Sequence, residues 1–260
     1  MRCLILWMCW LSFVVQAQPV RLITVIEPPV SYLDSHGKPV GFAVDVVKAV
    51  QHELGDKTPI EVMPEARAIY IARTEPNVLL FSFSRTPERE NEFYWITPLV
   101  QKSWSVYGLT TNPIQVQSLE QLKQVTAIGV VRGDIREEWL NNLGFKNLSK
   151  SVNHQQNLDR LLAGRLDLIA YESQGIRHLL QEASLSLDAV RPVFVLQQSD
   201  VYLLMSKTGT SPELAERWRM AADKIRRSGS QQFIAEKWQL QLKHFQDMDT
   251  EIQNGVLVFK

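Results

Sequence analysis

The stretch Asn77-Val-Leu-Leu-Phe-Ser-Phe-Ser-Arg-Thr-Pro-Glu-Arg89 decides the fold. Its first half, residues 78–83, is a nearly continuous apolar run, which is typical of a strand buried on both faces of a parallel sheet. Hydrophobic patterning predicts two further strands upstream, at residues 20–27 and 59–63. It also predicts two helices between the strands, at residues 41–54 and 66–73. This alternation of strands and helices predicts a parallel sheet with helices on its faces.

The alternation restarts downstream and predicts a second, smaller α/β unit over residues 111–200. Two extended segments, 103–110 and 201–206, bracket this unit. The simplest arrangement is therefore a first lobe made of residues 18–110 and 201–260, with the second lobe inserted into it. The two extended segments would then cross between the lobes and act as a hinge.

The first residues have the layout of a secretory signal peptide. Arg2 precedes an unbroken apolar run at residues 3–15, and a small-residue site predicts cleavage after Ala17, with release into the periplasm. A membrane anchor is the alternative, but the run is shorter than the about 20 apolar residues that a spanning helix needs. Because Cys3 and Cys9 both lie in this segment, the exported chain would contain no cysteine, which excludes disulfides and zinc–thiolate sites.

The composition argues against several classes of partner. Hydrophobic residues make up 45% of the chain, which is enough for a core, and the formal net charge is zero. No polybasic run is present, which disfavours nucleic acid and anionic membranes as partners. Nucleophile-elbow, phosphate-loop and zinc-protease motifs are missing, and the five histidines lack metal-ligand spacing. We therefore expect no metal, no cofactor and no catalytic residue, and we expect the histidines to be surface or packing residues.

The second half of the quoted stretch carries the candidate binding chemistry. Thr86 and Pro87 are of the types that cap a helix and occupy its first position, which would put Arg89 in the first turn of a helix. That turn would follow the carboxyl end of a strand, where α/β sheets bind ligands and where a helix N-terminus favours an anion. Ser82 and Ser84 are two residues apart and would therefore share one face of the strand. The alternative is that Arg89 pairs with a neighbouring glutamate on the surface.

Several short motifs follow one another along nearly the whole mature chain. They are Pro28-Pro29-Val30, Gly37-Lys38-Pro39-Val40-Gly41-Phe42 with Asp45, Phe83-Ser84-Arg85-Thr86-Pro87-Glu88-Arg89, Gly129-Val130-Val131-Arg132-Gly133, Ala163-Gly164-Arg165-Leu166-Asp167 and Lys237-Trp238. Each motif alone is weakly specific, but together and in this order they resemble the polar amino-acid family of periplasmic solute-binding proteins. The resemblance implies a two-lobed α/β clamshell with a two-strand hinge, which closes on a small ligand.

The resemblance also implies roles for individual residues. Arg89 matches the arginine that holds the α-carboxylate of the ligand in amino-acid-binding members, and groups around Ser82 and Ser84 assist it. Glu172 takes the position of an acid in the second lobe that holds the α-amino group. The implied ligand is an amino acid or a related polar compound, gripped at both ends when the lobes close.

Two departures from the family pattern concern acidic residues. Glu27 stands where the family often has an aromatic residue, and Asp134 follows Gly133 where the family often has threonine or serine. Both acids would add negative charge to the cleft, so a cationic or polyamine-like ligand is a further hypothesis. Arg67 and Arg132 would equally serve to neutralise these acids, and Glu27 would equally be a solvated acid at a strand end.

These inferences favour a monomeric periplasmic protein, not an enzyme, that captures a small polar ligand and delivers it to a membrane permease of the ABC-transporter type. The first rival is an enzyme on the same fold, such as a cyclohexadienyl dehydratase, in which Glu172 or Glu27 would act as general acid or base. The second rival is a soluble sensor protein that presents its ligand to a separate receptor.

Overall fold

The strand in the quoted stretch forms β5 (Val78–Ser84), and all of its residues are buried. The computed structural model describes residues 20–259, so the predicted signal peptide lies outside the described residues. Strand β5 pairs in parallel with β1 (Arg21–Thr24), and β1 pairs in parallel with β4 (Ile60–Val62). Two helices connect these strands, namely α1 (Phe42–Leu54) and α2 (Glu65–Thr74). The predicted parallel sheet with helical connections is therefore confirmed.

The second lobe is a smaller unit built in the same way. Its strands β7 (Ile128–Val131), β8 (Leu148–Ser151) and β9 (Leu168–Glu172) are parallel, with β7 in the middle. Its helices are α3 (Leu119–Leu122), α4 (Ile135–Asn142), α5 (His154–Leu162), α6 (Ser173–Glu182) and the 3-10 turn η2 (Leu187–Ala189). Strand β8 was not predicted, because its residues Leu-Ser-Lys-Ser are mostly polar and lie at the edge of the sheet.

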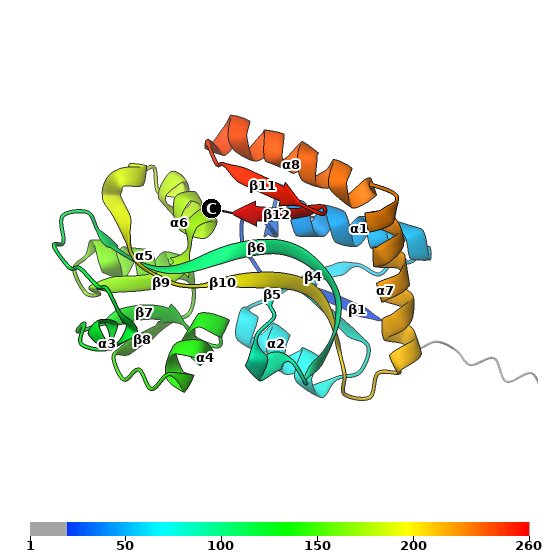
Figure 1. Ribbon diagram of the computed structural model, residues 1–260, viewed down its shortest axis with the longest axis horizontal. Coiled ribbons are helices and arrows are strands. Elements are labelled where there is room, and N and C mark those ends of the chain that lie inside the picture. The colour runs from blue at the N-terminus through cyan, green and yellow to red at the C-terminus, as the bar shows by residue number, and fades with distance from the viewer. Residues whose placement is uncertain (1–19, 260) are drawn as a thin grey trace, which may run out of the picture.

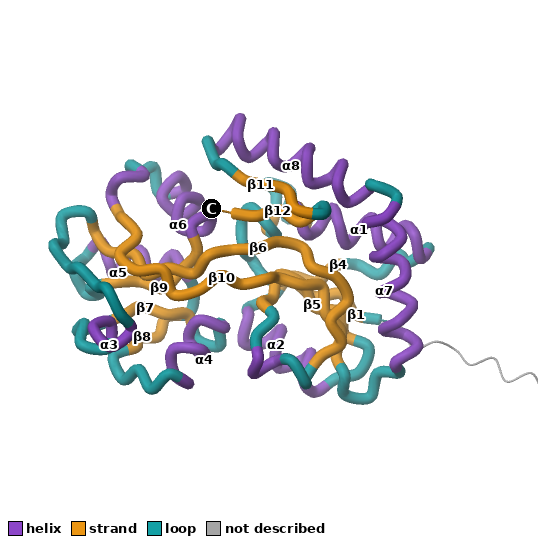
Figure 2. Tube along the Cα trace, in the orientation of Figure 1, coloured by secondary structure: helices purple, strands orange, loops and turns teal. Residues whose placement is uncertain are grey.

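Two strands of 17 residues each, β6 (Phe93–Leu109) and β10 (Val190–Ser206), run through both lobes. They pair with each other in antiparallel fashion along their whole length. Figures 1 and 2 show both strands crossing from one lobe to the other. The expected crossings at 103–110 and 201–206 are thus parts of much longer strands, and the clamshell with a two-strand hinge is confirmed.

The narrowest part of the connection is a two-stranded ribbon. Strand β12 (Val256–Phe259) pairs with β6 only as far as Gln101, and β9 pairs with β6 only from Trp104 onwards. Between these points, Lys102–Ser103 pair only with Gln198–Ser199 of β10, among the pairings of the described residues. We call these four residues the hinge ribbon. The hinge ribbon is therefore the narrowest part of the sheet that joins the two lobes in the described structure.

The C-terminal part of the chain completes the first lobe. It forms α7 (Pro212–Arg227), α8 (Ser230–Gln246) and the hairpin of β11 (Thr250–Gln253) and β12, while β2 (Tyr32–Leu33) and β3 (Pro39–Val40) form a small pair near the N-terminus. The Ser211 hydroxyl accepts a hydrogen bond from the Leu214 N–H at 3.2 Å and so begins α7. The C-terminal hairpin was not predicted, and it attaches the end of the chain to β6 (Figure 1).

Apolar side chains fill both faces of the sheet in each lobe. In the first lobe, Leu22 and its neighbour Ile23 in β1 belong to different cores, as the alternation of side chains along a strand requires. One core includes Trp218 of α7, and the other includes Ile71 of α2. Helices therefore cover both faces, which leaves the edges of the sheets between the lobes for polar residues.

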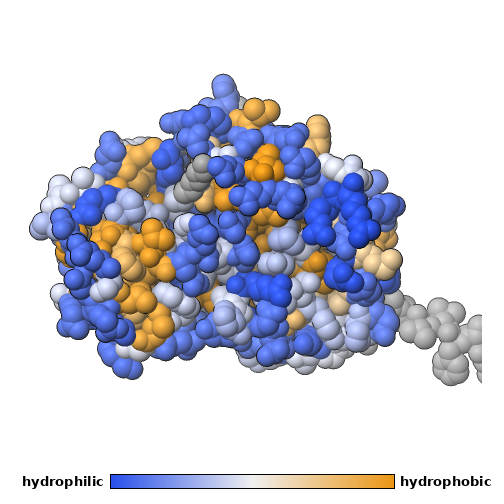
Figure 3. All heavy atoms as spheres, viewed as in Figure 1, coloured by the Kyte–Doolittle hydropathy of each residue, from blue (hydrophilic) through white to orange (hydrophobic). Residues whose placement is uncertain are grey.

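The described surface is mixed in character. Figure 3 shows mostly hydrophilic side chains on the face in view, with apolar side chains gathered over parts of the left-hand lobe. Among residues 20–259, no helix combines the length and the apolar character that crossing a bilayer would require.

Candidate functional site

Arg89 lies at the end of a single 3-10 turn, η1 (Pro87–Arg89), between β5 and β6. The expected α-helix does not form there, because the chain re-enters the sheet at Phe93. Pro87 does occupy the first position of the turn, but the Thr86 hydroxyl makes no capping hydrogen bond. The prediction that Arg89 lies in the first turn of an α-helix is therefore wrong. The turn nevertheless buries the Arg89 side chain, which is 1% exposed.

Ser82 interrupts the regular geometry of β5. Tyr202 of β10 lies opposite Phe83, and Leu203 lies opposite Phe81, so Ser82 is the extra residue of a β-bulge. Its φ of 70° is in the left-handed region, which is strained for a residue other than glycine. The simple alternation that placed Ser82 and Ser84 on one face of the strand does not hold through this bulge.

A small buried cavity between the lobes is lined by Arg89 and by both serines. Its volume is about 10 Å³, which is room for roughly one water molecule. The other lining residues come from both lobes, namely Glu27, Glu65, Phe83, Ile135, Arg136 and Glu172. The structure thus brings together five of the residues that the sequence analysis singled out. Of the other three, Asp134 contacts Arg136 of this lining, whereas Arg67 and Arg132 are exposed.

The Arg89 guanidinium is only partly paired. Its Nη2 donates to Glu138 Oε2 of the second lobe at 2.8 Å, and Arg73 Nη1 lies 3.6 Å from the other oxygen of Glu138. The Arg89 Nε and Nη1 atoms are buried and have no hydrogen-bond partner among the described residues. A buried donor without a partner is destabilising, so these two atoms are suited to an external acceptor.

Glu172, in contrast, is fully paired. Its Oε1 accepts a hydrogen bond from Arg136 Nη1, and its Oε2 accepts one from Gln174 Nε2 at 2.9 Å and lies 2.9 Å from Lys102 Nζ. Burial by itself would raise the pKa of Glu172, but Lys102 and Arg136 outweigh it and hold that pKa below its usual range. Glu172 is therefore ionised, and each of its oxygens is occupied by the protein's own donors.

Asp134 and Glu27 complete a group that we call the ion cluster, which consists of Glu27, Lys102, Asp134, Arg136 and Glu172. Asp134 begins α4 by accepting a hydrogen bond from the Arg136 N–H at 2.7 Å, and both of its oxygens also accept from the Arg136 guanidinium. Glu27 Oε2 lies 2.6 Å from Lys102 Nζ. Burial and the nearby Glu172 carboxylate raise the pKa of Glu27 to about 8, against the opposing effect of Lys102.

Lys102 and Arg136, the two cations of the ion cluster, were not predicted. Arg67 and Arg132, which were considered as neutralising residues, are both exposed. A signal for Lys102 existed, because it alternates with the apolar Val100 and Trp104 and therefore lies on a buried face of β6.

Two more residues at the lobe interface were missed, Glu65 and His154. Burial and the Asp134 carboxylate raise the pKa of Glu65, and burial lowers the pKa of His154, whose ring stacks on Tyr171 at 3.6 Å. The side-chain atoms of Glu65, Asp134 and His154 that could coordinate a metal ion lie within 4.8 Å of one another. His154 is thus a packing residue, as expected, but it also belongs to a polar group that spans the cleft.

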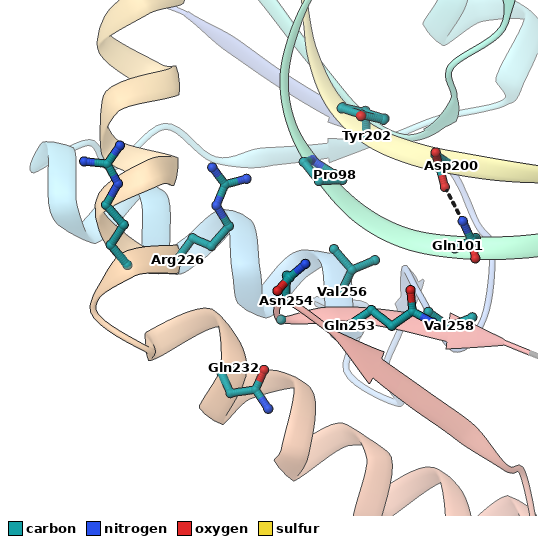
Figure 4. A pocket seen from close by; sticks show the side chains of 12 residues that line it. Pro98, Gln101, Asp200, Tyr202, Arg226, Gln232, Gln253, Asn254, Val256 and Val258 are labelled. Atoms are coloured by element: carbon teal, nitrogen blue, oxygen red, sulfur yellow. Dashed lines mark hydrogen bonds between the residues drawn. The ribbon is translucent and has the colours of Figure 1, made fainter.

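The described residues also form two larger hollows. One, of about 660 Å³, opens between the lobes beside Glu65; we call it the interlobe pocket. The other, of about 590 Å³, lies on the first lobe, where Tyr202 and the hydrogen-bonded pair Gln101 and Asp200 meet Arg226 and the C-terminal hairpin (Figure 4). The second hollow shares no lining residue with the buried cavity, so it is separate from the candidate site.

Comparison with known proteins places this geometry in a family. The model of the family described as bacterial extracellular solute-binding proteins, family 3, matches residues 20–241. The sensor domain of a histidine kinase with similarity to periplasmic binding proteins has a TM-score of 0.74 at 19% identity, covering 84% of this chain and 95% of that one. An ancestral arginine-binding protein bound to arginine has a TM-score of 0.71 at 22% identity, covering 84% and 97% of the two chains.

The solute receptor for L-cysteine of Neisseria gonorrhoeae has a TM-score of 0.71 at 20% identity, covering 86% of this chain and 92% of that one. At such identities these structures show the fold, which is that of the two-lobed periplasmic binding proteins. The family match extends over most of the chain and includes every residue of the buried cavity and of the ion cluster. The chain therefore belongs to family 3 of the bacterial extracellular solute-binding proteins.

Proposed function

We propose that this protein captures an amino acid or a related small carboxylate between its lobes and delivers it to a membrane transporter. The observation that carries the proposal is the buried Arg89 guanidinium, which lines the cavity between the lobes and has two nitrogens without a partner. A carboxylate is a strong acceptor for a guanidinium. Nε and Nη1 lie on different edges of the Arg89 guanidinium, so a ligand carboxylate would accept a hydrogen bond from one of them and a second acceptor in the cavity would satisfy the other. The hydroxyls of Ser82 and Ser84 line the same cavity and would add hydrogen bonds.

Closure of the lobes would be part of capture. The cavity is formed by residues of both lobes, and Arg89 of the first lobe already contacts Glu138 of the second. A ligand that contacts both lobes stabilises the closed arrangement, because only closure completes its contacts. Small-angle scattering should therefore show a smaller radius of gyration at saturation with ligand than without ligand.

The setting of this function follows from the family and the sequence. Extracellular solute-binding proteins act outside the cytoplasm, which supports export to the periplasm with cleavage after Ala17, so the mature chain should begin at Gln18. We propose that it works as a monomer with a membrane permease. The printed names of two structural neighbours, an arginine-binding protein and a receptor for L-cysteine, support an amino acid as the ligand class.

A sensor role is the second candidate, and it is favoured by the likeness to the sensor domain of a histidine kinase. In that case the closed protein would present its ligand to a receptor, and the same site would be used. A dehydratase has less support, because Glu172 is ionised and both of its oxygens are occupied. Neither alternative changes the expectation for Arg89.

The test is a thermal-shift screen of the mature protein against amino acids and small organic acids, followed by calorimetry. A ligand at 100 times its dissociation constant should stabilise the protein by about 2.7 kcal/mol. Arg89→Ala should weaken binding by roughly 30-fold or more, because truncating one partner of a buried charged contact typically costs 2–5 kcal/mol. The matched control is Arg85→Ala, since Arg85 lies in the same connection but is exposed and pairs with Glu90. Equal binding by Arg89→Ala and the wild type would refute the proposal.

A further inference from the structure

Two residues that line the buried cavity keep buried polar atoms without a partner. The first is Arg89, through Nε and Nη1. The second is Glu65, whose Oε2 accepts no hydrogen bond among the described residues. Glu65 is the first residue of α2, so it belongs to the first lobe, as Arg89 does. The cavity therefore offers donors for an anion at one point and an acceptor for a cation or an N–H group at another.

Glu172, to which the family resemblance assigns the amino group of the ligand, is a poor acceptor in this chain. Lys102 and Arg136 are 1% and 2% exposed, and both contact its carboxylate. An ammonium group could reach Glu172 only by displacing one of these cations, which would leave a buried charge unpaired. An ammonium group at Glu65 would displace no cation of the protein, because Glu65 Oε2 accepts no hydrogen bond from the described residues.

Glu65 also lines the interlobe pocket, so it borders both the buried cavity and a larger space. At about 660 Å³, this pocket has the size of a small-molecule site. Its walls are mainly apolar and come from both lobes, through Val25, Ile26, Val62, Met63, Val131 and Val152. Ile26 is 50% exposed and Val152 is 70% exposed, and an apolar group in the pocket would cover such surface.

We propose that the ligand is an amino acid with an apolar side chain, whose carboxylate contacts Arg89, whose ammonium contacts Glu65, and whose side chain occupies the interlobe pocket. This inference rests on the proposed function and specifies its ligand. It moves the amino-group contact from the second lobe to the first, and it departs from the polar ligands that the sequence resemblance implies. Because the buried cavity has room for roughly one water, the lobes must separate slightly or side chains must repack to admit both charged groups.

A metal ion is the competing occupant near Glu65, since Asp134 and His154 lie close to it. Both oxygens of Asp134 are bound to Arg136, however, and Arg136 Nη2 lies 3.4 Å from His154 Nε2. A metal bound by all three residues would stand beside this fixed positive charge. An ammonium group needs only Glu65 and carries a single positive charge, so it meets less of the repulsion from Arg136 than a divalent ion would.

Binding of an ammonium group has a proton signature. Burial and Asp134 raise the pKa of Glu65, so Glu65 holds a proton more readily than a solvated glutamate. A cation beside Glu65 favours its ionised form, so an amino acid should release a proton on binding, whereas a carboxylate without an amino group should not. Calorimetry in two buffers of different ionisation enthalpy measures this difference.

The decisive experiment uses a matched set of probes with the mature protein. Three probes share one apolar body and differ in their charged groups. L-Leucine carries both the carboxylate and the amine, 4-methylpentanoate carries only the carboxylate, and 3-methylbutylamine carries only the amine. L-Asparagine has nearly the same shape as leucine but a polar side chain. We expect leucine to bind at least tenfold more tightly than each of the other three probes, with proton release.

Glu65→Gln tests the assigned contact. It should weaken leucine binding tenfold or more while leaving the affinity for 4-methylpentanoate unchanged, and a melting curve should show that it folds. The control is Glu75→Gln, because Glu75 adjoins the other end of α2 and pairs on the surface with Arg21. It should behave as the wild type with every probe.

Three results would overturn the inference. Tight binding of asparagine, glutamine or arginine with no binding of leucine would exclude the apolar side chain but leave the proposed function intact. Equal affinity for leucine and 4-methylpentanoate would exclude the role of Glu65. Stabilisation by Zn²⁺ alone, abolished in Glu65→Gln, would show a metal site in its place. Failure of every amino acid and every carboxylate to bind would instead refute the proposed function itself.

Discussion

Two groups of buried charges meet at the interface between the lobes, and they differ in how completely they are paired. In the ion cluster, each carboxylate contacts a cation of the protein, with Lys102 between Glu27 and Glu172 and Arg136 between Asp134 and Glu172. Beside it, Arg89 and Glu65 keep buried polar atoms without partners. Neutralisation of each carboxylate by a cation of the protein indicates a structural role, although Lys102 Nζ makes ion-pair contacts to Glu27 and Glu172 without hydrogen-bond geometry. Incomplete pairing indicates a place where another molecule supplies the missing contacts.

This comparison changes how the acids of the cleft should be interpreted. Counting Glu27 and Asp134 as free acids suggested a cationic or polyamine-like ligand. In the structure Arg136 binds both oxygens of Asp134, and Lys102 lies against Glu27, so neither acid is free to attract a ligand. What the cleft recognises depends on which groups remain unpaired and not on the number of acids.

The largest expected effect comes from breaking the ion cluster at Lys102. Lys102→Met would leave Glu27 and Glu172 in a buried site without their shared cation. Removing one partner of a buried ion pair typically costs about 3–5 kcal/mol, which should lower the melting temperature by on the order of 10 °C. Urea and thermal unfolding measure the change. Lys57→Met, at an exposed lysine, is the control, and identical melting of the two variants would show that the cluster contributes nothing to stability.

A second prediction concerns pH, and it separates the two kinds of acid in the cluster. The pKa of Glu27 is raised to about 8, so its contribution to stability is complete below its ordinary pKa of about 4.5 and is lost as the pH rises through 8. The pKa values of Asp134 and Glu172 are lowered, so their contributions are present above their ordinary pKa values and are lost on acidification. The melting temperature should therefore fall as the pH rises from about 5 to 8 and level off above pH 8.

Glu27→Gln should make that fall shallower, because glutamine keeps the neutral form of the side chain and has no proton to lose. The advantage of the variant should grow as the pH rises from 5.5 and be complete near pH 8, where the variant should be the more stable of the two. The measurement is a melting curve at intervals from pH 5.5 to pH 9. A wild-type melting temperature that rises over this range would contradict the assigned direction for Glu27.

The smallest expected effect tests closure without substituting any member of either group of charges. Gly133 of the second lobe has φ +75°, and a Cβ there would lie 2.8 Å from the Ala66 Cβ of the first lobe. Gly133→Ala should therefore disfavour the closed arrangement and weaken ligand binding by roughly 10-fold, the equivalent of 1.4 kcal/mol. Gly144→Ala is a matched control, because Gly144 has φ +82° with nothing within 4 Å of a Cβ. Both variants carry the same backbone strain, so equal loss of binding would mean that closure is not impeded.

Much of the fold could be predicted because local patterns are consistent with it. The apolar run of β5 and the helix α1 lie within a residue or two of where the sequence placed them. The C-terminal hairpin was missed because its position depends on pairing with β6, which is more than a hundred residues away in the chain. The bulge at Ser82 was missed for the same reason, since it is defined by the register against β10.

The candidate site could be predicted only in part. Arg89 and the two serines lie in one stretch, so their grouping is local, and the structure places all three around one cavity. Lys102, Arg136 and Glu65 come from three different elements and meet only when the lobes are in contact. Which charges neutralise each other is a property of that contact, so the sequence assigned the pairing to Arg67 and Arg132, which are exposed.

The hinge ribbon described above has a consequence for whatever receives the ligand. A ribbon of two strands resists stretching, because its hydrogen bonds hold the strands together, but it takes up twist more readily than a wide sheet does. We therefore expect the ribbon at Lys102–Ser103 and Gln198–Ser199 to behave as a torsion joint, which alters the angle between two otherwise rigid bodies. A membrane protein that contacts both lobes would respond to that angle and not to the solute. Any solute that brings the lobes to the same angle would then produce the same output.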